Sequence, residues 1–412
     1  MKNVNALSVM LQGSRVGELV AIPRRGVFFS YDPGWLAKGF NLAPFHMDFS
    51  VKPQSAADPL LFDSLHGAFS DSLPDGWGLL LMDRFFRSQL GVERHKIGPL
   101  DRLAYMGNRS MGALEYAPMF EAVEADEDLD LAALYEASQT ILSGSTDEVI
   151  SSLRLAGGSP GGARPKAVIG LSPDKHRAIS SFGEMPVGYE HWLIKFRSEE
   201  EHRDSGAIEQ VYALMAHRAG IEISESQLFQ VETNKGEERF FATKRFDRAE
   251  GTKRHMLTAA AILYADFRKP SLDYSDLLRA TWAMTKDAAE VEKMARLMVF
   301  NALAHNHDDH AKNFSFFGGK DGWKMAPAYD LTFSSTAGRG NEHTTAFAGR
   351  GKPTRKALIE VCKPFSFLAP ERYIEQTLDA FSEWRVCGAD LEIDKTASKK
   401  LLTTLESVWQ AL

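Results

Sequence analysis

The chain has 412 residues, of which 44% are hydrophobic and 25% charged, and this balance predicts a soluble globular protein with two or three lobes. The formal net charge of −7 argues against DNA or an anionic membrane as the main partner, and no apolar run reaches the roughly 20 residues that a membrane helix needs. The two cysteines, Cys362 and Cys387, exclude a disulfide framework and predict a reducing cytoplasm.

The first part of the chain predicts a small β-rich unit. Short apolar runs separated by glycine and charged turns are typical of strands, and they lie at residues 7–11, 16–20 and 27–31. Between Phe69 and Gln89 the apolar spacing becomes helical, after the turn-forming residues Pro74-Asp75-Gly76. We therefore expect a β-rich N-terminal subdomain that carries a helix.

An acidic stretch from Glu121 to Asp130 predicts the first boundary between domains. Strand-like runs follow at residues 167–170, 191–196 and 240–243, with an amphipathic helix at 208–219 that ends at Gly220. From Thr258 onward the pattern is mostly helical. The fold class is therefore predicted as α+β, with domains over residues 1–120, 121–250 and 251–412.

A glycine-rich segment, Gly157 to Lys166, lies immediately before a predicted strand. Glycine allows a tight turn that brings backbone N–H groups close to an anion, and Lys166 adds positive charge. The segment is not a Walker A motif, because no Gly-Lys-Ser/Thr is present. Its position favours a phosphate-binding loop, and an ordinary surface turn is the alternative.

Lys195 lies inside the apolar strand pattern Trp192–Phe196. In a kinase such a lysine holds nucleotide phosphates, with Glu209 on the next helix as its candidate partner, whereas a snorkelling edge lysine is the alternative. The segment Thr243–Arg248 follows the next strand. In a two-lobed kinase the backbone of this linker binds adenine, and the alternative is a strand end with an exposed ion pair.

The densest group of polar residues is the run Asn306–Asn313. Phosphoryl transfer needs a carboxylate that accepts the substrate proton, and protein kinases place an asparagine ligand of magnesium five residues after it. The step from Asp308 to Asn313 is 313 − 308 = 5, whereas Asp309 gives four, so Asp308 is the predicted base. Asp330 is the candidate second metal ligand, and a polar helix end is the alternative for the run.

A competing interpretation uses the same run differently. His305-x-His307-x-Asp309-His310 matches the pattern of metallo-β-lactamase-type hydrolases, which bind two zinc ions. It assigns no role to the glycine loop, Lys195, Asn313 or Asp330, and the motif follows an amphipathic helix instead of a strand. Two tightly bound zinc ions per chain would exclude the kinase interpretation.

With these features in order, the sequence resembles the HipA family of toxin kinases from bacterial toxin–antitoxin pairs. The resemblance covers nearly the whole chain and rests on seven segments: residues 71–78, 100–107, 161–166, 194–195, 245–248, 308–313 and 329–330. It implies a two-lobed kinase fold with a β-rich N-terminal subdomain and a mostly helical C-terminal lobe.

The resemblance also implies roles for single residues. Asp308 would be the catalytic base, and Asn313 and Asp330 would hold Mg²⁺. Ser159 matches a loop serine that relatives autophosphorylate, which would add about two negative charges and switch the kinase off. The implied ATP-binding residues are Gly161, Gly162, Ala163, Arg164, Pro165, Lys166, Lys195, Lys244, Arg245, Phe246, His310, Ala311, Lys312, Asn313, Tyr329 and Asp330.

Finally, the resemblance implies a substrate and a partner. HipA-type kinases phosphorylate an aminoacyl-tRNA synthetase, typically the glutamyl enzyme, and the resulting block in translation causes growth arrest and persistence. The partner is a HipB-type helix-turn-helix antitoxin that supplies most contacts to operator DNA. A catalytically dead corepressor scaffold is the non-enzyme alternative, and the presence of Lys195, Asp308, Asn313 and Asp330 argues against it.

Overall fold

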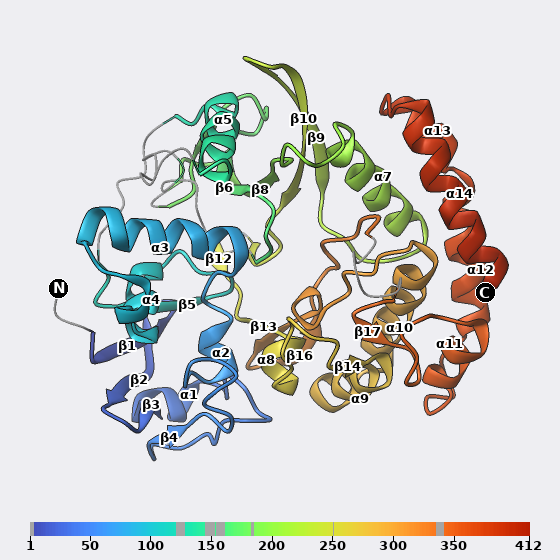
Figure 1. Cartoon of the computed structure of the whole chain (residues 1–412). Helices are drawn as coiled ribbons and strands as arrows, with labels where there is room; N and C mark the ends of the chain where they lie inside the picture. Colours follow the sequence, from blue (N-terminus) through green and yellow to red (C-terminus); the bar gives the residue numbers. More distant parts are fainter. Residues whose placement is uncertain are drawn as a thin grey trace. The chain divides into compact units, whose positions relative to one another are not determined.

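The computed structural model describes residues 4–120, 128–144, 153, 161–182, 185–249, 251–334 and 342–412. The chain has a two-lobed α+β fold, as predicted, with two compact units (Figure 1). The first unit comprises Met1–His202, Phe229–Leu257 and Gly318–Lys320, and the second comprises Arg203–Leu228, Thr258–Phe317 and Asp321–Leu412. No helix in the described ranges is long and apolar enough to span a membrane. The predicted domain boundaries near residues 120 and 250 stay predictions.

The N-terminal part of the first unit is built on an antiparallel five-stranded sheet of order β4-β3-β2-β1-β5. Alternating burial along β1, with Leu7, Val9 and Leu11 turned inward, shows why the period-two pattern forms a half-buried strand. The three strands predicted from the sequence are confirmed. The strands are β1 (Ala6–Leu11), β2 (Ser14–Ile22), β3 (Gly26–Tyr31), β4 (Gln54–Ser55) and β5 (Leu114–Ala117).

The helix expected after the turn Pro74-Asp75-Gly76 is confirmed as α3, and a short helix, α2, precedes that turn. Proline disfavours helical backbone in the residue before it and lacks an N–H, so Pro74 interrupts the helical spacing. Gly76 then begins the longer helix with a left-handed φ of +44°. The helices of this part are α1 (Pro33–Lys38), α2 (Gly67–Ser70), α3 (Gly76–Leu90) and α4 (Pro99–Met106), with a 3-10 turn at Arg94–Lys96.

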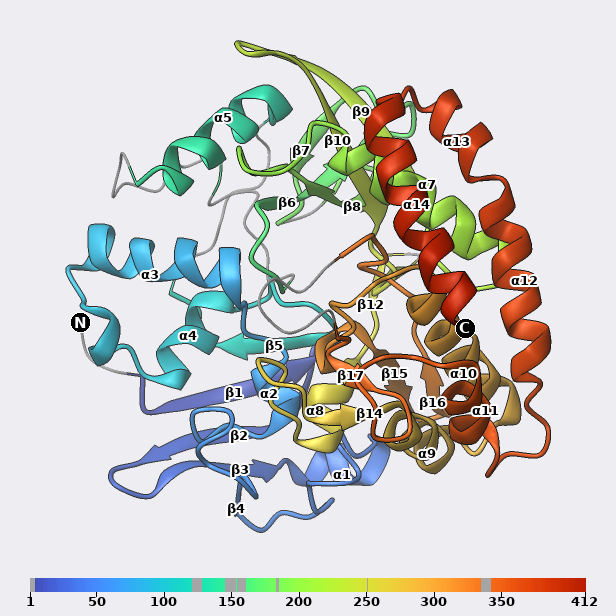
Figure 2. The same cartoon turned by 45° about the vertical axis from the view of Figure 1, so that its right-hand side comes forward.

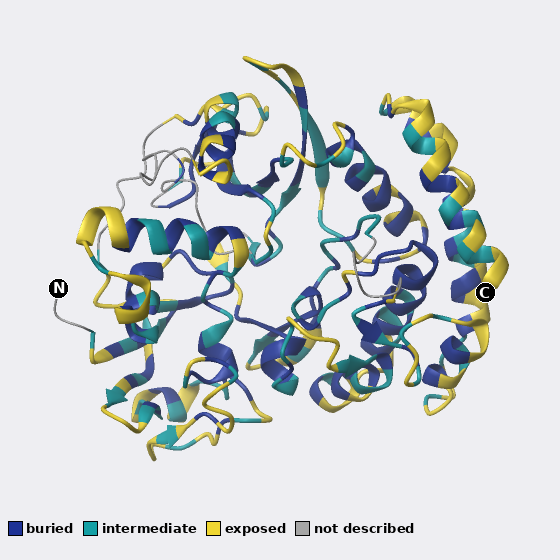
Figure 3. Ribbon diagram, in the orientation of Figure 1, coloured by how far each residue is buried: buried dark blue, intermediate teal, exposed yellow. Residues whose placement is uncertain are grey.

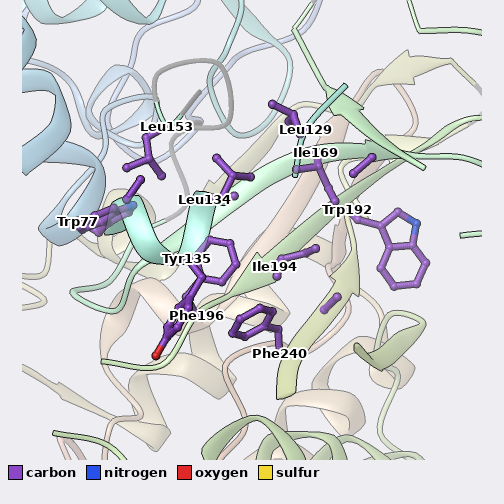
Figure 4. Packing of buried hydrophobic residues seen from close by; sticks show 14 of the residues in the cluster. Trp77, Leu129, Leu134, Tyr135, Leu153, Ile169, Trp192, Ile194, Phe196 and Phe240 are labelled. Carbon is purple, nitrogen blue, oxygen red and sulfur yellow. The ribbon is translucent and has the colours of Figure 1, made fainter. Parts of the chain in front are cut away.

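A second sheet of the first unit has the order β7-β6-β8-β10-β9. Its core contains Trp77 from α3, Tyr135 from α5 (Leu131–Leu142), Ile194 and Phe240 (Figure 4). Each large side chain buried there contributes roughly 1.5–3 kcal/mol to folding. The strands of this sheet are β6 (Lys166–Leu171), β7 (Ala178–Ser180), β8 (Glu190–Lys195), β9 (Ser226–Thr233) and β10 (Gly236–Lys244). Three short strands outside this sheet follow in the chain: β11 (Arg248–Ala249), β12 (Thr252–Lys253) and β13 (Met256–Thr258).

The second unit is mostly helical. Helix α10 is buried along most of its length (Figure 3). Its methionines Met294 and Met298 are fully buried in the core. Helices α12 and α13 pack against α7 (Figure 2). The elements are α7 (Ser205–Arg218), α8 (Ala259–Leu263), α9 (Tyr274–Thr285), α10 (Ala288–Leu303), α11 (Arg355–Cys362), α12 (Pro370–Ser382), α13 (Trp384–Asp390), α14 (Lys395–Ala411), β14 (Leu272–Asp273), β15 (Ser315–Gly319), β16 (Gly322–Met325) and β17 (Thr345–Ala346).

Candidate functional site

Two lysines meet at the start of the second sheet. Strand β6 begins at Lys166, directly after the glycine loop, and Lys166 pairs across the ladder with Lys195 at the end of β8. Their exposed fractions are only 5% and 6%, and directly paired residues project from the same face of a sheet. The Lys195 ammonium lies 5.6 Å from the centroid of the Phe241 ring. Two buried cations at one place suit a multiply charged anion such as a phosphate chain.

The described part of the glycine loop, Gly161 to Lys166, is held by specific contacts. Gly162 has a φ of +97°, which favours glycine, and the Lys166 ammonium donates to the Gly161 carbonyl. Arg164 donates from Nε to the Phe196 carbonyl at 3.2 Å and lies 3.3 Å from a Glu201 carboxylate oxygen. The Arg164 side chain is therefore engaged in an ion pair, and anion binding by the loop stays a prediction that concerns its backbone and Lys166.

The segment after β10 contains a buried ion cluster. Asp247 is fully buried and accepts from Arg245 Nη2 at 2.7 Å, from Arg248 Nη1 at 2.7 Å and from the Gly112 N–H at 2.8 Å. Burial alone raises the pKa of the Asp247 carboxyl, but the two guanidiniums and these hydrogen bonds outweigh it and hold that pKa well below its usual range. Lys244, by contrast, forms a half-exposed ion pair with Glu190. The Arg245 side chain is thus structural, so adenine contacts by residues 244–246 stay a prediction that concerns the backbone.

In the second unit, the predicted catalytic run follows α10 through a sharp turn. His305 adopts a φ of +52°, which turns the chain away from the helix axis. Asp308 is exposed, whereas residues 301–307 and Asp309 are buried. The Asp308 backbone N–H donates to Ser334 Oγ at 2.9 Å, and the Asp308 carbonyl accepts from the Asn313 amide Nδ2 at 2.7 Å. The structure therefore fixes the backbone on both sides of a solvent-accessible carboxylate and joins it to Asn313.

Asp309 anchors the same run to the following segment. Its carboxylate accepts from the Tyr274 hydroxyl at 2.8 Å and from the N–H groups of Thr344 and Thr345 at 2.9 and 3.0 Å. The imidazole Nδ1 of His343 lies 3.0 Å from the same carboxylate. Buried polar groups need such partners, and here they tie two chain segments together.

Tyr329 and Asp330 are attached to the run by further hydrogen bonds. The Tyr329 hydroxyl donates to the Lys312 carbonyl. The Asp330 carbonyl accepts from Asn306 Nδ2 at 3.4 Å, and Asp330 has a left-handed φ of +52°. An aspartate tolerates this conformation better than most residues, but the position is special and typical of functional sites.

Among the described residues, those of the competing zinc motif do not form a metal site. Asp309 is committed to the partners described above, and His310 Nδ1 accepts from the Lys312 N–H at 3.2 Å. Burial lowers the pKa of His305 to about 4 and that of His307 to about 3, and their rings lie 3.9 Å apart between centroids. Within the described ranges, no group of three or more His, Cys, Asp or Glu side chains is arranged to hold a metal ion. The zinc interpretation is therefore not supported by the geometry.

The predicted magnesium ligands fit their role chemically. Since Asn313 commits its amide nitrogen to the Asp308 carbonyl, the opposite end of the amide is the oxygen, which is the atom that Mg²⁺ prefers. Asp330 lies on a segment tied to the same run and supplies a carboxylate. An amide oxygen and one carboxylate leave the remaining positions to water and phosphate oxygens, as is usual for this ion.

The structure thus brings the predicted residues together in two sets. Gly161 to Lys166 and Lys195 form one set in the first unit, and Asp308, residues 310–313, Tyr329 and Asp330 form the other in the second unit. Glu209 is buried on α7 of the second unit, and its pairing with Lys195 stays a prediction. Ser159 lies outside the described residues.

Sequence reasoning missed the side chains that support these sets. Ser334, His343, Thr344 and Thr345 lie 26 to 36 residues from their partners in the catalytic run, and Tyr274 lies 35 residues before Asp309. Single hydroxyls, an imidazole and backbone N–H groups at such separations leave no local pattern, so only the folded chain identifies them.

Comparisons with known proteins agree with this architecture. Residues 158–386 match the HipA-like C-terminal domain, and residues 7–117 match the HipA N-terminal domain. The HipA toxin of Shewanella oneidensis MR-1, solved with HipB and operator DNA, is similar over 98% of this chain and 96% of its own, with a TM-score of 0.69 and 16% identity. The proinflammatory kinase CtkA of Helicobacter pylori matches 52% of this chain and 92% of its own at a TM-score of 0.32 and 13% identity. At this TM-score the likeness does not establish a shared fold.

Proposed function

Because the chain belongs to the HipA family, we propose that it is a protein serine/threonine kinase that uses Mg-ATP and acts as the toxin of a toxin–antitoxin pair. One observation supports the enzyme most directly. Asp308 is the exposed carboxylate of an otherwise buried stretch, and its carbonyl is bonded to Asn313 at 2.7 Å. This combination of an accessible base and a fixed neighbouring amide is what kinase chemistry needs.

In the proposed reaction, Asp308 accepts the proton of a substrate serine or threonine hydroxyl. The hydroxyl oxygen forms the new bond to the γ-phosphorus, the bond from that phosphorus to the β,γ-bridging oxygen breaks, and ADP leaves. Lys166, Lys195 and the glycine-loop backbone bind the phosphates. Asn313 and Asp330 would hold Mg²⁺, which offsets phosphate charge when it is bound.

The proposal extends to regulation and partners. Phosphate on Ser159 would place about two negative charges next to the residues that bind ATP phosphates, which opposes nucleotide binding. The similar Shewanella toxin was solved with HipB and operator DNA, which supports a helix-turn-helix antitoxin as the partner of this chain and DNA binding through it. An aminoacyl-tRNA synthetase, in particular the glutamyl enzyme, is the proposed substrate, and growth arrest in the cytoplasm is the expected consequence.

The test is incubation of the purified chain with Mg-ATP and a cell lysate, followed by phosphoproteomics. We expect new phosphoserine or phosphothreonine on a synthetase and phosphate on Ser159, both lost in Asp308→Ala. Asp321→Asn, which changes an exposed aspartate at a turn of the same unit, is the matched control and should retain activity.

Two outcomes would count against the proposal. If active protein never carries phosphate on Ser159, the autoregulation is wrong although the kinase can stand. If Asp308→Ala arrests growth as strongly as the wild-type chain and neither phosphorylates protein, the corepressor scaffold is the better explanation.

A further inference from the structure

The turn before α3 contacts the glycine loop of the same unit. The Gly162 N–H donates to the Asp75 carboxylate, although the two residues are 87 positions apart. The Trp77 N–H donates to the Gly162 carbonyl at 3.0 Å, and the Trp77 indole Nε1–H donates to the Lys166 carbonyl at 3.1 Å. One short segment, Asp75–Trp77, therefore binds the N–H and the carbonyl of Gly162. It also binds the carbonyl of Lys166, the first residue of β6.

The Asp75 side chain binds the glycine loop and does not cap its own helix. It occupies the N-cap position of α3, where an aspartate normally accepts from the first N–H groups of its own helix. No such bond is made by its side chain, whereas Asp32 and Asp130 do cap α1 and α5. The Asp75 carboxylate is committed to the glycine loop instead.

Two glycines allow the backbones to come this close. A Cβ added to Gly76 would lie 2.8 Å from the Cα of Ala163 and still nearer to the Gly162 carbonyl. A Cβ added to Gly161 would lie 3.0 Å from both Asp75 carboxylate oxygens. The approach leaves no room for a side chain at position 76, and one at position 161 would push the Asp75 carboxylate away, so the sequence Asp75-Gly76-Trp77 is fitted to this loop.

We propose that Asp75, assisted by Trp77, is a positioning residue that holds the Gly162 peptide in the shape that binds nucleotide phosphate. The inference rests on the proposed function and assigns the N-terminal subdomain a part in it. A loop that is ordered beforehand loses less conformational entropy on binding, so the contact should favour nucleotide affinity more than the rate of phosphoryl transfer.

The contact also admits an opposite effect, in which the Asp75 carboxylate competes with phosphate for the Gly162 N–H. The two bonds made by Trp77 to carbonyl oxygens favour positioning, because a competitor for an anion site would have no use for them. The two effects differ in sign: positioning predicts weaker nucleotide binding when the carboxylate is removed, and competition predicts tighter binding.

The experiment compares Asp75→Ala with Asp75→Asn, whose side-chain oxygen still accepts from an N–H but carries no charge. Asp130→Ala is the matched control, since it removes an aspartate N-cap from α5 in the same unit. Hydrogen exchange of the peptide spanning residues 161–168 reports the loop directly, without nucleotide. Titration with a fluorescent ATP analogue and the KM for ATP report its function.

We expect faster exchange of this peptide in Asp75→Ala, with affinity for the analogue weakened and the KM for ATP raised about tenfold while kcat changes less. Asp75→Asn and Asp130→Ala should resemble the wild type. Should Asp75→Ala fail to fold, Trp77→Phe keeps an aromatic ring in the core and removes the indole donor, and it should change exchange and affinity in the same direction by less.

Unchanged exchange in Asp75→Ala, or tighter nucleotide binding in either Asp75 variant, would overturn the inference. An equal effect in Asp130→Ala would also overturn it, because that result reflects a general loss of helix capping. If the wild-type chain binds no nucleotide, the proposed function fails, and the exchange comparison alone then decides whether Asp75 holds the loop.

Discussion

Each unit contains an aspartate that is fully buried beside residues predicted to bind nucleotide. Asp247 in the first unit is bound by the guanidiniums of Arg245 and Arg248, and Asp309 in the second unit by a hydroxyl, an imidazole and two backbone N–H groups. The first is an ion cluster and the second is a hydrogen-bond network made mostly of neutral donors.

This difference shows two ways of fixing a segment. An ion cluster relies on complete pairing, because the loss of one member leaves the others charged in a medium that solvates them poorly. A network of neutral donors loses less when its centre is removed, and it orders the chain next to Asp308 without placing a guanidinium there. The predictions below test whether this contrast holds.

The largest effect is expected from Asp308→Ala, which should lower the rate of phosphate transfer without lowering the stability of the fold. Removal of a general base typically costs a factor of about 10² to 10⁴ in rate, and the exposed Asp308 side chain lies outside the core. Phosphate transfer should therefore fall by that factor, while the midpoint of thermal unfolding stays close to that of Asp321→Asn. A large loss of stability in Asp308→Ala would mean that the residue is structural, as its neighbour Asp309 is.

The next largest effect is expected on stability from Asp247→Ala. Two guanidiniums would remain in the core without their carboxylate, and breaking a buried pair in this way costs about 3–5 kcal/mol. Urea unfolding measures the change, with Asp321→Ala as the control. A loss below about 1 kcal/mol, the range of exposed ion pairs, would contradict the ion-cluster interpretation.

Asp309→Ala should be less destabilising than Asp247→Ala. It leaves the N–H groups of Thr344 and Thr345 and the Tyr274 hydroxyl without their acceptor. Each unsatisfied buried group costs roughly 1–3 kcal/mol, but a water molecule in the space of the deleted carboxylate would accept from these neutral donors and recover most of that cost. One water cannot do the same for two buried guanidiniums. Urea unfolding of both variants under one condition gives the comparison. Equal or larger destabilisation by Asp309→Ala would reverse the contrast between the two aspartates.

The smallest effect, counted per pH unit, concerns the pH dependence of stability through His307. Its folded pKa is lowered to about 3 mainly by burial, so between pH 6.5 and about 3 the unfolded chain binds a proton that the folded chain does not. Stability should therefore fall as the pH falls through this window, by less than about 1.4 kcal/mol per pH unit for one group.

His307→Asn should flatten that slope, measured as unfolding midpoints between pH 4 and 7. The Asp247 contribution runs through a different window. Because its folded pKa is depressed, its stabilisation is present above the unfolded value near pH 4 and is lost only as the pH falls further. An unchanged slope above pH 4 in His307→Asn would refute the assignment.

Local spacing alone predicted much of the fold. Alternating apolar residues identified β1, and the apolar helical face identified α10, because both patterns reflect one buried side of a single element. The helical spacing after the turn Pro74-Asp75-Gly76 likewise identified α3, which begins at Gly76. The competing zinc pattern shows the limit of short motifs, since spacing cannot say whether side chains converge.

The family, the order of the motifs and the five-residue step from Asp308 to Asn313 could be identified without the structure, because they are properties of neighbouring residues. Only the tertiary structure decided what holds those motifs in place: Asp309 by residues around position 344, Asp247 by Gly112, and the glycine loop by Asp75 and Trp77. Such contacts join residues 34 or more positions apart, and a single hydrogen-bonding side chain at that distance leaves no periodic trace in the sequence.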